Sequence, residues 1–176
     1  EKIELHPDYD QYSHENAIKY SDYALGTFYD AAKASAYYKD TIFLFAADHN
    51  TRVKGHDLIP VHKFRIPGLL IGPNIPPMTY EKVCSNIDML PTILHFMNVG
   101  GETPLLGRNL MTLPEDDPGR AIMQYGKTYG FRIGDTVSVI RPHAEILDFT
   151  YADKTLHPIE TDEELNQLAL AHALLP

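Results

Sequence analysis

The chain has 176 residues, of which 44% are hydrophobic and 22% charged, ordinary values for about one globular domain. Its formal net charge at pH 7 is −9, from 15 basic and 24 acidic residues. This charge, with no basic stripe in the sequence, excludes a protein that binds the nucleic-acid backbone without sequence preference. The single cysteine excludes an intrachain disulfide framework, and no apolar run reaches the roughly 18 residues of a membrane span.

The first half of the chain predicts one long helix and two strands. Apolar residues at steps of three and four predict an amphipathic helix over 14–34, with Ser13 as its N-cap. The almost wholly apolar run 41–47 predicts a strand covered on both faces, and 66–73 predicts a shorter buried strand. Between them lies a polar loop, 50–65, of a length that is often functional.

The second half predicts a short helix, an antiparallel meander and a terminal helix. Asp88 would cap a helix over 88–97. Three β-prone runs between 121 and 141, separated by glycine turns, predict the meander at one edge of a sheet. The tail 161–175 predicts an amphipathic helix that opens with a capping box at Thr161.

The most informative feature is Asp48-His49, which directly follows the apolar run 41–47. In open α/β sheets, ligands bind beyond the carboxyl ends of the strands. A carboxylate and an imidazole at this point are therefore candidate metal ligands. The alternative is a turn at the end of the strand, in which both side chains only satisfy backbone groups.

Six segments occur in the order of a known family and at compatible spacing: 16–26, 39–49, 65–73, 85–94, 106–110 and 118–125. This series, which covers about residues 14–140, resembles the sulfatase-like lipoteichoic acid synthase (phosphoglycerol transferase) family of the alkaline phosphatase superfamily. The resemblance implies an α/β fold, a partial alkaline-phosphatase-like sandwich whose mostly parallel sheet is flanked by helices. The antiparallel meander and the terminal helix would complete it.

The resemblance also implies a domain organisation. Residues 1–176 would be a single segment, the C-terminal half of a sulfatase-like catalytic domain, with 141–176 peripheral. Family members contribute a Thr or Ser nucleophile and a further acidic metal ligand from the N-terminal half, and neither is recognisable in this chain. We therefore expect no catalytic nucleophile among these residues, and we expect the missing N-terminal half to be the main partner of the segment.

Within this family, Asp48 and His49 would hold a divalent metal. One oxygen and one nitrogen ligand favour Mn²⁺ or Mg²⁺ over a thiolate-rich zinc site, with Zn²⁺ as a further candidate. The metal would act as a Lewis acid and lower the pKa of the nucleophilic hydroxyl. A covalent phosphoryl- or phosphoglycerol-enzyme intermediate on the missing threonine would follow.

Four further residues are candidates for binding the substrate. Arg52 would clamp a phosphate oxygen bidentately, or would be only a solvated loop charge. His62, next to Lys63, stands where sulfatase-like enzymes often place a contact to the substrate oxyanion. His56 is a weaker candidate, and so is His6, because its His-Pro sequence lacks the Ser of the family's Ser-His-x-Pro stretch.

The resemblance implies a metal-dependent phosphoglycerol transferase or sulfatase-like hydrolase that acts on phosphate or sulfate esters, such as a phospholipid headgroup, at the cell envelope. One alternative is a soluble phosphodiesterase or a true sulfatase, although Cys84 is not followed by the Cys-x-Pro-x-Arg motif that a sulfatase needs. Another is a non-catalytic accessory domain with the same fold. Without its nucleophile, the isolated chain is expected to be inactive.

Localisation follows from the resemblance alone. The parent protein would be anchored in the cytoplasmic membrane by upstream helices, with an extracytoplasmic catalytic domain. The segment itself is expected to be soluble, to meet the membrane only through those upstream segments, and not to bind nucleic acid.

Overall fold

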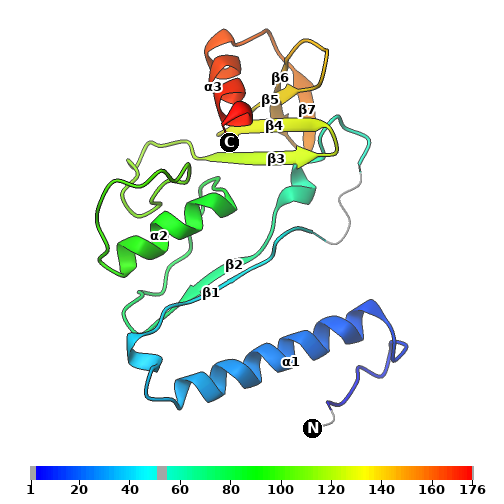
Figure 1. The fold of residues 1–176 in the computed structure, drawn as a ribbon. Helices are drawn as coiled ribbons and strands as arrows, with labels where there is room; N and C mark the ends of the chain where they lie inside the picture. The colour runs from blue at the N-terminus through cyan, green and yellow to red at the C-terminus, as the bar shows by residue number, and fades with distance from the viewer. Residues whose placement is uncertain (1–2, 51–54, 176) are drawn as a thin grey trace. The chain divides into compact units, whose positions relative to one another are not determined.

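The structure is a computed structural model that describes residues 3–50 and 55–175. The chain divides into two compact units, one of residues 1–43 and 70–75 and the other of residues 44–69 and 76–176 (Figure 1). The boundaries fall inside two short strands, β1 (Phe43–Ala46) and β2 (Gly68–Ile71). Asp48, His49 and the C-terminal part of the chain therefore belong to the same unit.

The first unit is built on α1 (His14–Lys33), which confirms the predicted helix. Ser13 caps it as expected, because its side chain accepts the backbone N–H of Asn16 at 3.2 Å. Of the α1 side chains, only Asn16 and Ala32 are buried. The predicted apolar face is otherwise exposed, with Ile18 55% and Phe28 52% accessible.

Aromatic rings join α1 to the chain that follows it. The rings of Tyr29 and Phe43 meet edge to face with centroids 5.5 Å apart, and Tyr38, from the 3-10 turn η1 (Tyr38–Asp40), stacks on Phe43 at 6.1 Å. The hydroxyls of Tyr29 and Tyr38 are 3.2 Å apart. Tilted and edge-on ring pairs stabilise beyond the area that they bury. This cluster therefore holds the start of β1 against α1.

β1 and β2 form a two-stranded sheet. Ala47 directly follows β1 and Pro67 directly precedes β2. The N–H of Ala47 donates to the carbonyl of Pro67 at 3.2 Å. That pairing makes the two strands antiparallel. Leu44 of β1 is 38% exposed and Leu69 of β2 is 55% exposed, so the described residues do not cover both faces as the apolar sequence predicted.

The second unit contains the predicted meander, extended to five strands. The strands pair in sequence order, and every pair is antiparallel. Outside these pairs and the β1–β2 pair, a single parallel bridge, between Val83 and Gly119, occurs among the described residues. The strands are β3 (Arg120–Tyr125), β4 (Thr128–Ile133), β5 (Thr136–Ile140), β6 (Leu147–Ala152) and β7 (Thr155–Pro158).

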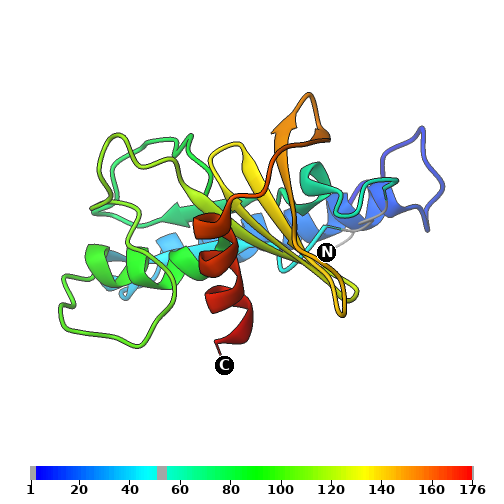
Figure 2. The ribbon, with the colours of Figure 1, turned by 90° about the horizontal axis from the view of Figure 1, so that it is seen from above.

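The two faces of this sheet are covered by different segments, because successive side chains of a strand point to opposite faces. The terminal helix α3 (Glu163–Leu174) packs Leu165 and Ala169 against Phe131. On the other face, Ile59 and the 3-10 turn η2 (Val61–Phe64) join the core. Figure 2 shows α3 and the η2 turn on opposite sides of the sheet.

Two of the predicted caps differ from the structure. The helix predicted over 88–97 is α2 (Met89–Phe96), and the Asp88 side chain makes no capping bond to it. Asp88 instead closes a capping box with Ser85 at the start of the preceding 3-10 turn, η3 (Asn86–Asp88). At α3 the N-cap is Asp162 and not Thr161, because the Asp162 side chain accepts the N–H of Leu165 at 3.0 Å.

The sequence did not predict β6 and β7. Asp148 interrupts the apolar pattern of β6, yet it is 4% exposed because it has partners. Its carboxylate accepts the hydroxyl of Ser138 at 2.6 Å and the N–H of Asp162 at 2.8 Å. The carboxylate thereby links two strands to the start of α3. The sequence alone does not show that a charged residue at this position has such partners.

Candidate functional site

Asp48 and His49 lie in the bend that follows β1, at the strand end where the sequence predicted them. Their side chains are 87% and 73% exposed, respectively. Oδ1 of Asp48 accepts the backbone N–H of His49 at 2.8 Å, which fixes the carboxylate against the next residue. The pair therefore projects from a strand end with its remaining ligand atoms open to solvent.

The histidine ring is oriented by a second contact. Nδ1 of His49 lies 3.0 Å from the carbonyl oxygen of Asn50, so Nδ1 carries the proton and donates it. The lone pair of Nε2 is then free to bind a cation. A hydrogen bond from the other ring nitrogen to a backbone carbonyl is typical of histidines that bind metals.

The spacing of the two side chains fits a shared cation. Nε2 of His49 is 3.4 Å from Oδ2 of Asp48. Two ligand atoms that each bind one ion at about 2.1 Å stand about 3.0–3.4 Å apart at octahedral to tetrahedral angles. The same 3.4 Å contact would be an ion pair if the imidazole were protonated. A measurement of metal binding distinguishes a metal-binding pair from a simple ion pair.

Two ligands do not complete a metal site. Among residues 3–50 and 55–175, no group of three or more His, Cys, Asp or Glu side chains converges in a way that could hold a metal. A divalent cation takes at least four ligands, including any waters. Asp48 and His49 therefore fit as one part of a site.

His62 belongs to the same unit and lies on η2. Its side chain is half-buried, and its Nδ1 is buried with no hydrogen-bond partner in the described part of the chain. His56 is exposed, with no burial that would fix its ring. Arg52 lies outside the described residues.

His6 belongs to the first unit. Its backbone N–H donates to Oδ1 of Asn16 at 2.8 Å, and its ring centroid is 4.9 Å from that of Tyr9. These contacts tie His6 to the start of α1. Of the candidates that the structure describes, only Asp48 and His49 are joined to one another by a hydrogen bond or an ion pair.

Cys84 is not suited to be a nucleophile. Burial raises the pKa of its thiol, and the negative charge of Asp88 raises it further. A thiol with a raised pKa stays protonated at neutral pH and reacts poorly. This agrees with the absence of a formylglycine motif after Cys84.

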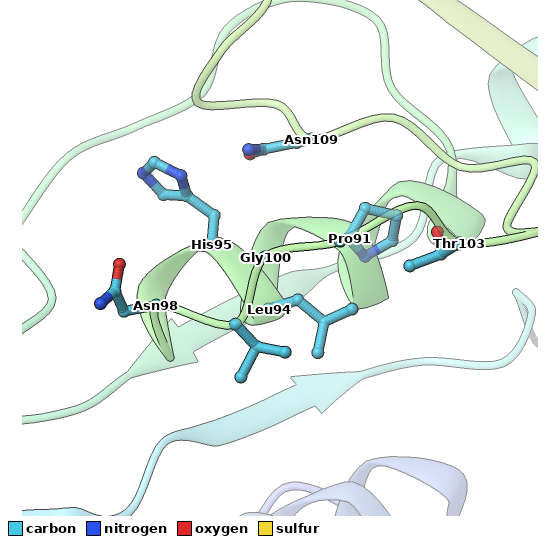
Figure 3. A pocket seen from close by; sticks show the side chains of 9 residues that line it. Pro91, Leu94, His95, Asn98, Gly100, Thr103 and Asn109 are labelled. Carbon is cyan, nitrogen blue, oxygen red and sulfur yellow. The ribbon is translucent and has the colours of Figure 1, made fainter.

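Sequence reasoning missed two hollows in the second unit, and neither is lined by Asp48 or His49. One, of about 390 Å³, lies beside α2, where His95 and Asn109 are among the labelled side chains (Figure 3). The other, of about 410 Å³, includes Tyr129 and His172. The first is lined by residues of one short stretch, 91–109, and the second by segments that lie between 87 and 175, so a hollow between them depends on tertiary packing.

The described helices include none with the length and hydrophobicity needed to cross a membrane.

The sequence profile of the Sulfatase family matches residues 8–99, just over half of the chain. A crystal structure of a protein in the alkaline phosphatase superfamily from Vibrio parahaemolyticus is similar over 99% of this chain, with 43% sequence identity and a TM-score of 0.89. The match spans 43% of that longer protein. It confirms the predicted α/β fold with its antiparallel meander and terminal helix.

Proposed function

Because the chain belongs to the sulfatase family, we propose that it forms part of a metal-dependent enzyme that acts on phosphate or sulfate esters. Membership of this superfamily supports hydrolysis or transfer at such an ester. The observation that carries the metal dependence is the 3.4 Å contact between Asp48 and His49, with the histidine ring held by Asn50.

Asp48 supplies a hard carboxylate oxygen, and His49 supplies Nε2. The mixed oxygen and nitrogen set favours Mn²⁺ or Mg²⁺, with Zn²⁺ as the third candidate. When bound, the cation would offset the charge that builds on the transferred group and lower the pKa of the attacking hydroxyl. The backbone contacts of both residues would keep the ligand atoms in place without rearrangement.

The substrate carries a tetrahedral anionic group, which needs positive charge and hydrogen-bond donors around it. Arg52 would bind two of its oxygens with one guanidinium, and His62 would donate to the oxyanion. His56 and His6 are secondary candidates for the same contact. We assign none of these residues a role as nucleophile.

The more specific proposal is a phosphoglycerol transferase, or a sulfatase-like hydrolase, that works at the cell envelope on an ester such as a phospholipid headgroup. The chain spans 43% of the Vibrio protein, so the Thr or Ser nucleophile and the remaining metal ligand would come from another part of a longer protein. In this proposal, upstream membrane helices hold an extracytoplasmic domain, and the 176-residue chain alone does not turn over substrate.

Metal binding is the direct test. Titration calorimetry with Mn²⁺ on the 176-residue chain is expected to detect a weak site, and Asp48→Ala or His49→Ala should weaken it by about tenfold or more. The exposed Asp116→Ala and His157→Ala are matched controls that should leave the affinity unchanged. Equal affinity in all five proteins would remove the pair as the metal site.

Turnover is tested in the longer protein with bis(p-nitrophenyl) phosphate and p-nitrophenyl sulfate as separate substrates. The phosphodiester is the expected substrate, and its hydrolysis should require added Mn²⁺ and be lost in Asp48→Ala. Preference for the sulfate ester would instead identify a true sulfatase. Lack of turnover with both would favour the accessory domain, and turnover by the 176-residue chain alone would contradict its predicted inactivity.

A further inference from the structure

Residues 59–64, which precede β2 in the chain, are anchored in the five-stranded sheet. Ile59 is fully buried and Val61 is 6% exposed, and both belong to one hydrophobic cluster with four sheet residues. These are Met123, Val137, Val139 and Phe149. A loop residue with no exposed surface is held by packing as firmly as a core residue of a strand.

The sheet leaves room for Ile59 at one point. A Cβ added to Gly130, in the middle of β4, would lie only 2.7 Å from Cδ1 of Ile59. Non-bonded carbon atoms pack at about 3.5–4.0 Å, so a methyl group at this position would force the end of the Ile59 side chain to shift. The absence of a side chain at Gly130 therefore forms the seat into which Ile59 inserts.

Two further contacts hold the described residues around this turn. At its base, the N–H of Ala47 donates to the carbonyl of Pro67 at 3.2 Å, which closes the loop that contains Asp48 and His49. After Ile59, the ring of Phe64 meets that of Tyr125 edge to face, with centroids 6.5 Å apart. His62 thus lies on a short turn that is held on either side, by Val61 and by Phe64.

We propose that Ile59 is a positioning residue of this site. By packing on one face of the C-terminal meander, over Gly130, it fixes the turn that carries His62, so that the substrate oxyanion meets this imidazole at a set place. The inference rests on the proposed function, and it extends the site to the sheet residues around Gly130, for which the sequence indicated no role in the site. The meander is then the support of the turn that carries His62.

Three variants separate this role from a loss of overall stability. Ile59→Ala removes the inserted side chain, Ile59→Val removes only its Cδ1 atom and keeps the packing of both Cγ atoms, and Gly130→Ala adds a methyl group that meets Cδ1. Leu165→Ala is the matched control, because it removes a similar buried side chain from the other face of the sheet, under α3.

The first measurement is hydrogen exchange of residues 55–64 in the 176-residue chain, which needs no activity. Ile59→Ala is expected to raise exchange there by about thirtyfold or more, and Ile59→Val and Gly130→Ala by much less. Leu165→Ala should raise exchange in α3 and leave residues 55–64 near the wild-type rate. Unchanged exchange of 55–64 in Ile59→Ala would overturn the inference.

The second measurement is steady-state hydrolysis of bis(p-nitrophenyl) phosphate by the longer protein. In Ile59→Ala, KM is expected to rise about tenfold with little change in kcat, because substrate binding loses a fixed contact. Ile59→Val should restore KM, and Leu165→Ala should leave it unchanged. Faster exchange with an unchanged KM would overturn the positioning role, whereas faster exchange in a protein without any turnover would count against the proposed function and leave the anchoring established.

Discussion

Asp88 shows how one buried carboxylate organises two segments that are separate in the sequence. The residue has no exposed surface, and its two oxygens accept the backbone N–H groups of Arg108 at 2.7 Å and Ser85 at 2.9 Å. Its own carbonyl accepts the hydroxyl of Thr92 at 2.7 Å. The carboxylate therefore joins the start of η3 to a loop twenty residues further along the chain.

Replacing Asp88 by Asn is expected to destabilise the protein although the two side chains have almost the same shape. The amide nitrogen would face one of the two N–H donors, so that one buried donor loses its acceptor. The free energy of unfolding should fall by about 3 kcal/mol. Urea unfolding followed by circular dichroism measures this change.

Asp135→Asn is the control for that experiment, because Asp135 is 78% exposed and pairs only at the surface with Arg132. A change within about 0.5 kcal/mol is expected for it. If Asp88→Asn were as mild as this control, the two buried hydrogen bonds would not carry the stability assigned to them.

At the scale of single elements, the start of α1 is held by one amide side chain. Asn16 is 2% exposed, and its Oδ1 accepts the N–H of His6 at 2.8 Å. Its Nδ2 donates to the carbonyls of Asp10 at 2.9 Å and Tyr9 at 3.3 Å. The helix therefore begins with a folded turn against it, which the Ser13 cap alone would not produce.

Asn16→Ala is expected to release this turn and leave the helix in place, because alanine keeps the helix propensity and removes all three bonds. Limited proteolysis within residues 5–12 should become at least about fivefold faster. Lys19→Ala, on the exposed surface of the same helix, is the control and should not change the rate. Equal cleavage rates in both variants would show that Asn16 does not hold the turn.

At the scale of the whole molecule, net charge determines which polymers the chain can bind, and the grouping of segments into units determines which residues can affect the proposed site. The net charge of −9 is spread over a chain in which residues 44–69 cluster with the C-terminal sheet and not with α1. Consequently the unit that contains Asp48 and His49 also contains the meander and α3. Changes in the C-terminal third of the sequence can therefore reach the proposed site through packing alone.

The charge leads to an expectation for binding. The 176-residue chain should not bind double-stranded DNA at physiological ionic strength. Binding to the DNA backbone needs a cluster of basic side chains that neutralise phosphates and so release the counterions of the DNA. A fluorescence-anisotropy titration with a labelled duplex measures it. Submicromolar binding that weakens steeply with salt would contradict this expectation.

Local patterns in the sequence were sufficient for most of the elements. Apolar spacing predicted α1 and α3, the candidate cap at Asp88 marked α2, and β-prone runs between glycine turns predicted the first three strands of the meander, because each of these signals lies within one short segment. The position of Asp48-His49 at a strand end was equally local, since the strand and the pair adjoin in sequence. The ordered motifs identified the superfamily for the same reason, as each motif is a short continuous segment.

Only the tertiary structure decided which residues those elements would meet. Asp148 is a strand residue because Ser138 and the N–H of Asp162 satisfy its charge, and Asp88 serves a capping box and a distant loop rather than α2. Ile59 reads in sequence as part of a polar loop, yet it is buried because Gly130, some seventy residues later, leaves a space for it. Such pairings depend on contacts between segments that are far apart in the chain, and no periodicity within one segment encodes them.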